Sequence, residues 1–179
     1  MSLSALAILL GLVFGLLSFY GAWKPSSFSS SLRKFPRSLP WGYVLMLAAT
    51  AWFLWNVKQE NISDFAPYKR LMLIGFAAVG IGACVFVKDF LAVRGLAILL
   101  LLVAKLMLDS ARWVDSQWRL VVVVLAYLWI LEGMWLTISP WRLRNMIGWM
   151  TANERRCRFL CAIRLAFCLF LILLGIVAY

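Results

Sequence analysis

The chain has 179 residues, of which 65% are hydrophobic and only 14% charged, and its mean hydropathy is +0.92. Soluble domains carry roughly half apolar and about a quarter charged residues, so this composition excludes a compact water-soluble core. The net charge of +11 would suggest nucleic acid in a soluble protein, but most basic residues fall between apolar segments. There they set orientation and meet anionic lipid head groups, so we expect no nucleic-acid partner.

Six apolar segments are long enough to cross a hydrocarbon core of about 30 Å as helices. In chain order they are residues 3–23, 41–57, 71–87, 90–108, 120–139 and 159–179, the last of which follows the basic start of its helix. Only Lys88 and Asp89 separate the third and fourth segments. One helix across both would be roughly 57 Å long, so we expect the chain to turn at these two residues.

The first segment carries small residues at every fourth position, Ala7, Gly11 and Gly15. On a helix they form a groove on one face, and such grooves let another helix approach closely in lipid. We expect this groove to pack within the chain, with a contact between subunits as the alternative.

Two connections differ in their predicted structure. Residues 24–40 (KPSSFSSSLRKFPRSLP) are expected to form a loop, because proline and serine interrupt helices. Residues 141–150 instead carry an apolar stripe at positions i, i+3, i+4 and i+7, which with the neighbouring arginines predicts a short amphipathic helix on the membrane surface. The stripe consists of Leu143, Met146, Ile147 and Met150. Thr151 and Glu154 then fit a capping box at the start of the last helix.

The distribution of Lys and Arg predicts the orientation. The first, third and fifth connections hold ten of these residues, and the second and fourth hold five. Because cytoplasmic loops carry the excess of positive charge, we expect loops 24–40 and 140–158 in the cytoplasm and both termini outside.

Glu132 is the only acid within any apolar segment. It lies seven residues from Ser139, roughly 10 Å from that end of its helix, and Arg164 and Arg94 fall at similar depths on two other segments. An unpaired charge in hydrocarbon is costly, so we expect Glu132, Arg164 and Arg94 to form an ion-paired layer that locks the helices together. The alternative is that Glu132 carries a proton or cation in a small transporter or channel.

Catalytic and metal chemistry find little support in the sequence. The chain has no histidine, which removes imidazole-based catalysis and ligation, and it carries none of the common nucleophile, phosphate-loop or zinc motifs. The cysteines form no CxxC pair and are expected to be small packing residues: Cys84, Cys157, Cys161 and Cys168. We therefore expect a protein that is not an enzyme, with no catalytic residue, cofactor or metal site.

The last third of the chain, residues 127–179, combines Leu131-Glu132-Gly133, then Ser139-Pro140-Trp141-Arg142, an amphipathic link and a late glycine, Gly175. This pattern resembles the YjeT-like family of small bacterial inner-membrane proteins. The chain departs from that family by carrying four apolar segments in front of the pattern. The resemblance implies a bacterial inner membrane and no particular activity.

Together these features predict an all-α polytopic membrane helical bundle with about six transmembrane helices and one short interfacial helix. We expect an N-terminal four-span region (1–119) and a C-terminal two-span hairpin (120–179) within one membrane domain. The favoured function is an accessory or scaffolding component that acts through helix–helix contacts, and the alternative is a small transporter or channel that uses Glu132. The expected partners are lipids, with anionic head groups at the cytoplasmic basic loops, and another membrane protein or a second copy.

Overall fold

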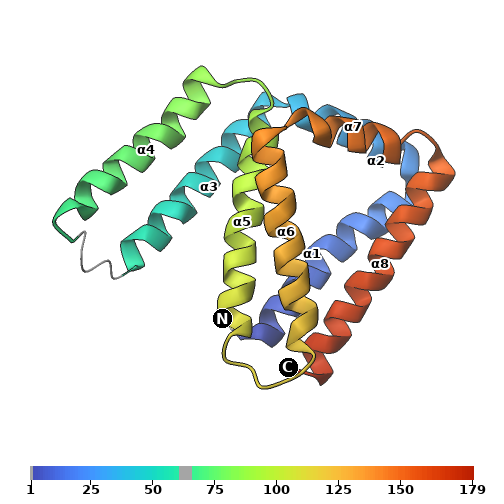
Figure 1. Ribbon diagram of the computed structural model, residues 1–179. Coiled ribbons are helices and arrows are strands. Elements are labelled where there is room, and N and C mark those ends of the chain that lie inside the picture. The colour runs from blue at the N-terminus through green and yellow to red at the C-terminus, as the bar shows by residue number, and fades with distance from the viewer. Residues whose placement is uncertain (1, 61–65) are drawn as a thin grey trace.

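A computed structural model describes residues 2–60 and 66–179, and this part of the chain is helical without strands (Figure 1). The all-α prediction is thereby confirmed. The elements in chain order are α1 (Leu3–Trp23), α2 (Pro25–Lys34), η1 (Phe35–Arg37), α3 (Leu39–Gln59), η2 (Ala66–Tyr68), α4 (Lys69–Phe86), α5 (Leu91–Ala111), α6 (Arg119–Ile138), α7 (Trp141–Met150) and α8 (Glu154–Val177).

Five of the described helices, α1, α4, α5, α6 and α8, are each long and apolar enough to cross a membrane. A sixth span is reached by α3 when it is taken together with α2 and η1, to which it is joined through a bend of 67°. Large apolar side chains are exposed along these helices, including Leu16, Val79 and Leu131, as expected where lipid replaces water as the solvent. The chain is therefore an integral membrane protein with five to six spans.

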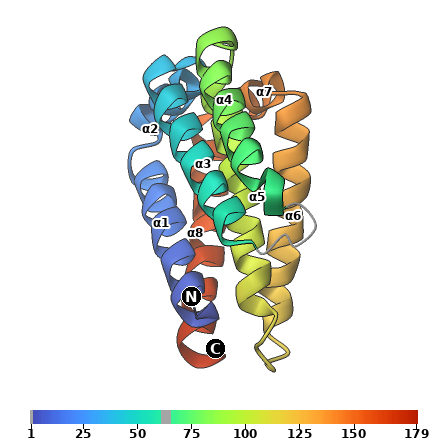
Figure 2. The ribbon, with the colours of Figure 1, turned by 90° about the vertical axis from the view of Figure 1, so that its left-hand side faces the viewer.

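The helices pair in an order that differs from their order in the chain. α1 packs most extensively on α8, α5 packs on α6 and α3, and α4 packs on α3. Figure 2 shows α1 beside α8, the first and last helices of the chain. The two helices of the predicted C-terminal hairpin, α6 and α8, thus rest mainly on helices of the N-terminal region, and the two regions interleave in one assembly.

The α1–α8 contact is close because small residues line it. Ala7, Gly11 and Gly15 are all buried, and a Cβ atom on Gly11 would lie 2.5 Å from Ile172 Cγ1. Further along, the Ser4 hydroxyl donates a hydrogen bond of 2.6 Å to the Gly175 carbonyl. The structure therefore places the predicted small-residue groove against α8 of the same chain.

One end of the bundle gathers the basic connections. α2, α7 and the α4–α5 turn lie at this end, and both chain termini lie at the other (Figures 1 and 2). The predicted turn at Lys88 and Asp89 is confirmed, since α4 ends at Phe86 and α5 begins at Leu91. Phe90 completes the turn in the left-handed region with φ of 55°, where an aromatic residue is uncommon.

The prediction of a loop over residues 24–40 is wrong, because this segment forms α2 and η1. Pro25 and Pro36 each occupy the first or second position of a helix, where the missing N–H costs no intrahelical bond. Ser29 and Ser30 turn their hydroxyls back onto the carbonyls three residues earlier, at 2.8 and 3.0 Å. Prolines at helix starts and locally satisfied serines therefore leave the helix intact.

The predicted capping box is also wrong. A capping box at Thr151 would start the last helix at Ala152, but the helix begins at Glu154. Its cap is Asn153, whose side chain accepts a hydrogen bond from the Arg155 N–H at 3.3 Å. Thr151 instead ends α7, because its hydroxyl donates to the Ile147 carbonyl at 2.7 Å. The short connection leaves room for one residue at each helix end, so Thr151 caps the helix before it.

Candidate functional site

A chamber of about 370 Å³ lies beneath α7, between α6 and α8. α7 forms its roof, and the remaining walls come mainly from apolar side chains of α1, α2, α5 and η1, including Phe14, Leu32 and Leu100. All four residues of the predicted amphipathic stripe line it: Leu143, Met146, Ile147 and Met150. The predicted short helix is present as α7, and its apolar stripe lines this chamber.

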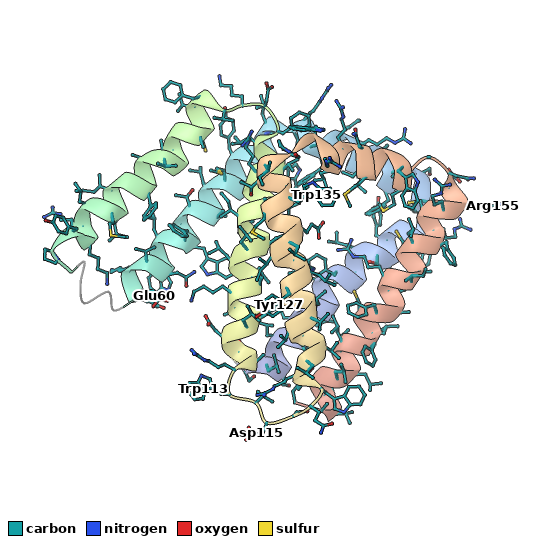
Figure 3. The ribbon with its side chains drawn as sticks, viewed as in Figure 1. Glu60, Trp113, Asp115, Tyr127, Trp135 and Arg155 are labelled. Atoms are coloured by element: carbon teal, nitrogen blue, oxygen red, sulfur yellow. The ribbon has the colours of Figure 1, made fainter. Side chains whose placement is uncertain are left out.

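Contacts at both ends hold α7 across the bundle. At its start, the Arg142 guanidinium lies 5.0 Å from the centre of the Trp135 ring on α6, and Figure 3 shows Trp135 close to where α6 meets α7. At its end, the Arg156 guanidinium lies 4.9 Å from the Trp149 ring centre. Such cation–π contacts are typically worth about 0.5–1 kcal/mol at exposed sites. Together with Pro140, which follows α6, they fix the direction of this short helix.

Two ionisable side chains of opposite sign line the chamber, Glu132 from α6 and Arg164 from α8. The same two residues also line an adjoining cavity of about 220 Å³ next to α1. Glu132 further lines a third cavity of about 220 Å³, with Trp135 and Arg142. Glu132 thus lies where three cavities meet.

The expected ion pair between Glu132 and Arg164 is not formed within 4.0 Å. Among residues 2–60 and 66–179 the ion pairs are those of Lys105 with Glu60, at 3.3 Å, and with Asp109, at 2.9 Å. The physical reason lies in the packing, because α6 rests on α5 and α8 rests on α1, so the two charged residues face the chamber from separate helix pairs.

The two charged residues of the chamber, Arg164 and Glu132, have different surroundings. The Arg164 guanidinium lies 4.9 Å from the centre of the Phe14 ring, an arrangement that favours a cation. The half-buried Glu132 accepts no hydrogen bond from the described residues, and its oxygens are not among their fully buried unpartnered atoms. The carboxylate is therefore accessible from the cavities that it lines.

Arg94 is not brought to this site. It belongs to α5 but does not line the chamber, and its Nε is a buried atom without a hydrogen-bond partner in the described part of the chain. The predicted layer of three residues thus reduces to Glu132 and Arg164 around a shared chamber.

Two features of this region were missed from the sequence. The first is Phe14, whose ring faces Arg164 across the α1–α8 pair; no local pattern relates residues so far apart. The second is Arg33, which binds the end of α7 through Thr151. Its segment was expected to be a loop, so no contact with α7 was anticipated.

Comparison with known proteins adds no relative: no family model matches the chain, and no curated protein or solved structure gives a match.

Proposed function

We propose that this integral membrane protein binds an amphiphilic ligand in the chamber beneath α7. The supporting observation is that Glu132 and Arg164 line one apolar chamber without forming an ion pair with each other. A charge without a partner is costly in the low dielectric of a membrane. A ligand with an ionised head and an apolar tail would satisfy a charged group while its tail covers the apolar walls.

The size of the chamber supports a ligand of this kind. Its volume of about 370 Å³ falls within the roughly 300–1,000 Å³ of small-molecule sites, which are mostly apolar with a few placed polar groups. A transporter that moves the bound molecule or a cation past Glu132 would use the same chamber, so ligand binding is the common first step.

Two photoreactive probes test the proposal, an alkyl-diazirine amine and an alkyl-diazirine fatty acid of equal length. We expect Glu132→Gln to lower labelling by the amine, and Arg164→Gln to lower labelling by the fatty acid, each on the order of tenfold, since a hydrogen bond to a charged group is worth about 1.5–3 kcal/mol. Peptide mapping by mass spectrometry should place the label on α6, α7 or α8 around the chamber.

Glu154→Gln and Arg158→Gln are the matched controls, because they remove the same charges at residues that do not line the chamber. Both should leave labelling unchanged. Labelling that is equal in all four variants, or that maps away from the chamber, would contradict the proposal.

An accessory role in a larger membrane assembly is the second proposal, favoured by one face of α4. Gly75 and Gly82 are seven residues apart and so share a helix face. A Cβ atom would meet nothing within 4 Å at Gly75, and only the Phe86 ring at 4.0 Å at Gly82. Gly80, on another face, packs against Thr50 of α3. A helix of another membrane protein, or of a second copy, fits the open glycine face, because small residues allow close approach in lipid.

We further propose that the chain resides in a bacterial inner membrane, with the end formed by α2 and α7 in the cytoplasm and both termini outside. The gathering of the basic connections at that end supports this orientation through the positive-inside bias. The resemblance of residues 127–179 to the YjeT-like family supports the compartment.

A further inference from the structure

A fourth cavity lies between α2 and α7 and shares only Ile147 with the chamber. This cleft of about 400 Å³ is lined by Arg33, Pro36, Arg144, Ile147, Gly148 and Ala152. Two guanidinium groups face it and no acidic side chain lines it. The helices that line the cleft, α2 and α7, lie at the end of the bundle that gathers the basic connections (Figure 1), so its surroundings reinforce the positive charge.

Arg33 is held in a fixed position by α7. Its Nε donates a hydrogen bond of 2.8 Å to the Thr151 hydroxyl, and one Nη donates at 2.6 Å to the Thr151 carbonyl. Thr151 is itself buried, with 6% of its surface exposed. The other Nη forms no bond to a described residue, so the guanidinium is oriented in advance and keeps donors for a ligand.

Arg144 supplies the second guanidinium from α7. Its Cζ lies 6.0 Å from the centre of the Phe90 ring, a contact that leaves its N–H groups free to donate. Gly148 follows one helical turn later, and a Cβ atom there would meet nothing within 4 Å. The cleft therefore combines two planar guanidinium groups with a stretch of backbone that a ligand can approach closely.

We propose that this cleft binds the phosphate head group of an anionic phospholipid. Planar guanidinium groups match phosphate oxygens through paired hydrogen bonds, and no acid in the lining opposes the negative charge. A lipid is the favoured source because the amphipathic helix α7 forms one side of the cleft, at the level where head groups meet the bundle. Pro36 and Ile147 are buried and close the cleft on its apolar side. The inference does not depend on a ligand in the chamber.

The test compares Arg144→Gln with Arg158→Gln in the purified full chain. Native mass spectrometry in a neutral detergent would measure binding of phosphatidylglycerol, with phosphatidylcholine, a zwitterionic lipid without net charge, as the comparison. We expect Arg144→Gln to weaken phosphatidylglycerol binding on the order of tenfold, because it removes the charge-assisted hydrogen bonds of one guanidinium group. Arg158→Gln removes the same charge outside the cleft and should change binding less than about twofold, as a diffuse surface charge does.

Two outcomes would overturn the inference. Equal weakening of phosphatidylglycerol binding by both substitutions would mean that the lipid responds only to the general positive charge at the end formed by α2 and α7. Displacement of phosphatidylglycerol by an equal concentration of glycerol 1-phosphate would mean that the cleft binds a soluble phosphate compound and not a lipid. Arg144 is exposed, so the variant should fold, which an unchanged melting temperature would verify.

Discussion

Single glycines determine how closely the helices of this bundle approach one another. Gly95 on α5 faces α3 so closely that a Cβ atom would lie 2.8 Å from the Met46 nitrogen and 2.9 Å from the Leu45 carbonyl carbon. Both are backbone atoms, which cannot move aside as a side chain can. Gly75 on α4 is the opposite case, with no atom within 4 Å of such a Cβ. The same residue type therefore has different roles on two helices.

This contrast yields a matched prediction. Gly95→Ala should destabilise the folded protein by about 1–3 kcal/mol, because an added methyl overpacks the α3–α5 contact. Gly75→Ala should be neutral or stabilising by up to about 1 kcal/mol, because alanine favours helix. Unfolding of the purified protein in detergent, followed by circular dichroism, measures both. Equal effects of the two substitutions would show that the α3–α5 contact does not limit stability.

At the level of residues, the sequence predicted that Glu132 and Arg164 lie at similar depths, and they line one chamber, but it did not predict their partners. Glu132 stands out because an acid within an apolar segment is costly wherever it lies. Its expected partner Arg164 lies across a chamber, and the Arg164 guanidinium faces the Phe14 ring. The depth of a charged residue along its helix can be counted from the sequence. The direction in which its side chain points depends on which neighbouring helix that helix packs against.

Among the elements, the two short helices α2 and α7 differ in how predictable they were. α7 carries an apolar stripe with helical spacing, so its existence and its apolar face followed from the sequence. α2 carries serines and prolines that ordinarily favour loops. Its helix depends on the prolines falling at helix starts and on Arg33 reaching Thr151, and such tertiary contacts leave no local signal.

The open glycine face of α4 leads to a prediction about binding of a neighbouring helix. Replacing both Gly75 and Gly82 by leucine should abolish binding of a neighbouring helix to this face, with at least a tenfold loss of co-purified partner or of dimer, since the bulky side chains prevent close approach. Ala162→Leu, at an exposed site on α8, is the matched control and should leave the complex intact. Blue native electrophoresis after mild detergent extraction measures both.

A lone monomer without any co-purified protein, before any substitution, would contradict the accessory role. So would a complex that survives the double leucine variant.

For the whole molecule, the number of membrane crossings determines whether the two termini lie on the same side of the membrane. Both termini lie at the end opposite α2 and α7 (Figure 1), which requires an even number of crossings. The sixth crossing comes from α3, which reaches the apolar length of a span only together with the bent segment before it. The orientation therefore depends on α3.

Reporter fusions test this arrangement. Alkaline phosphatase fused after Tyr179 should be active, because the enzyme folds only outside the cytoplasm, and the same reporter fused after Ala152 should be inactive. Green fluorescent protein at the two positions should give the reverse pattern. Activity at both fusion sites, or the reversed pattern, would contradict the proposed orientation.

The segmentation of the chain followed from bilayer thickness, which sets the length of each apolar run. The pairing of α1 with α8 and the peripheral position of α4 did not follow. In a soluble helix the polar face identifies the side that meets solvent, whereas lipid and helix neighbours are equally apolar here. The small-residue groove of α1 and the cysteines of α8 indicated contact surfaces, but neither indicated its partner helix.

Ile147 lines both the chamber and the cleft, so one wall, α7, serves two cavities. If each cavity binds its proposed ligand, any shift of α7 caused by one ligand changes the shape offered to the other. Thermodynamic linkage then requires the effect to be reciprocal: the factor by which a bound head group alters affinity in the chamber equals the factor by which the chamber ligand alters affinity in the cleft. The lipid composition of the membrane would in that way regulate what the chamber holds.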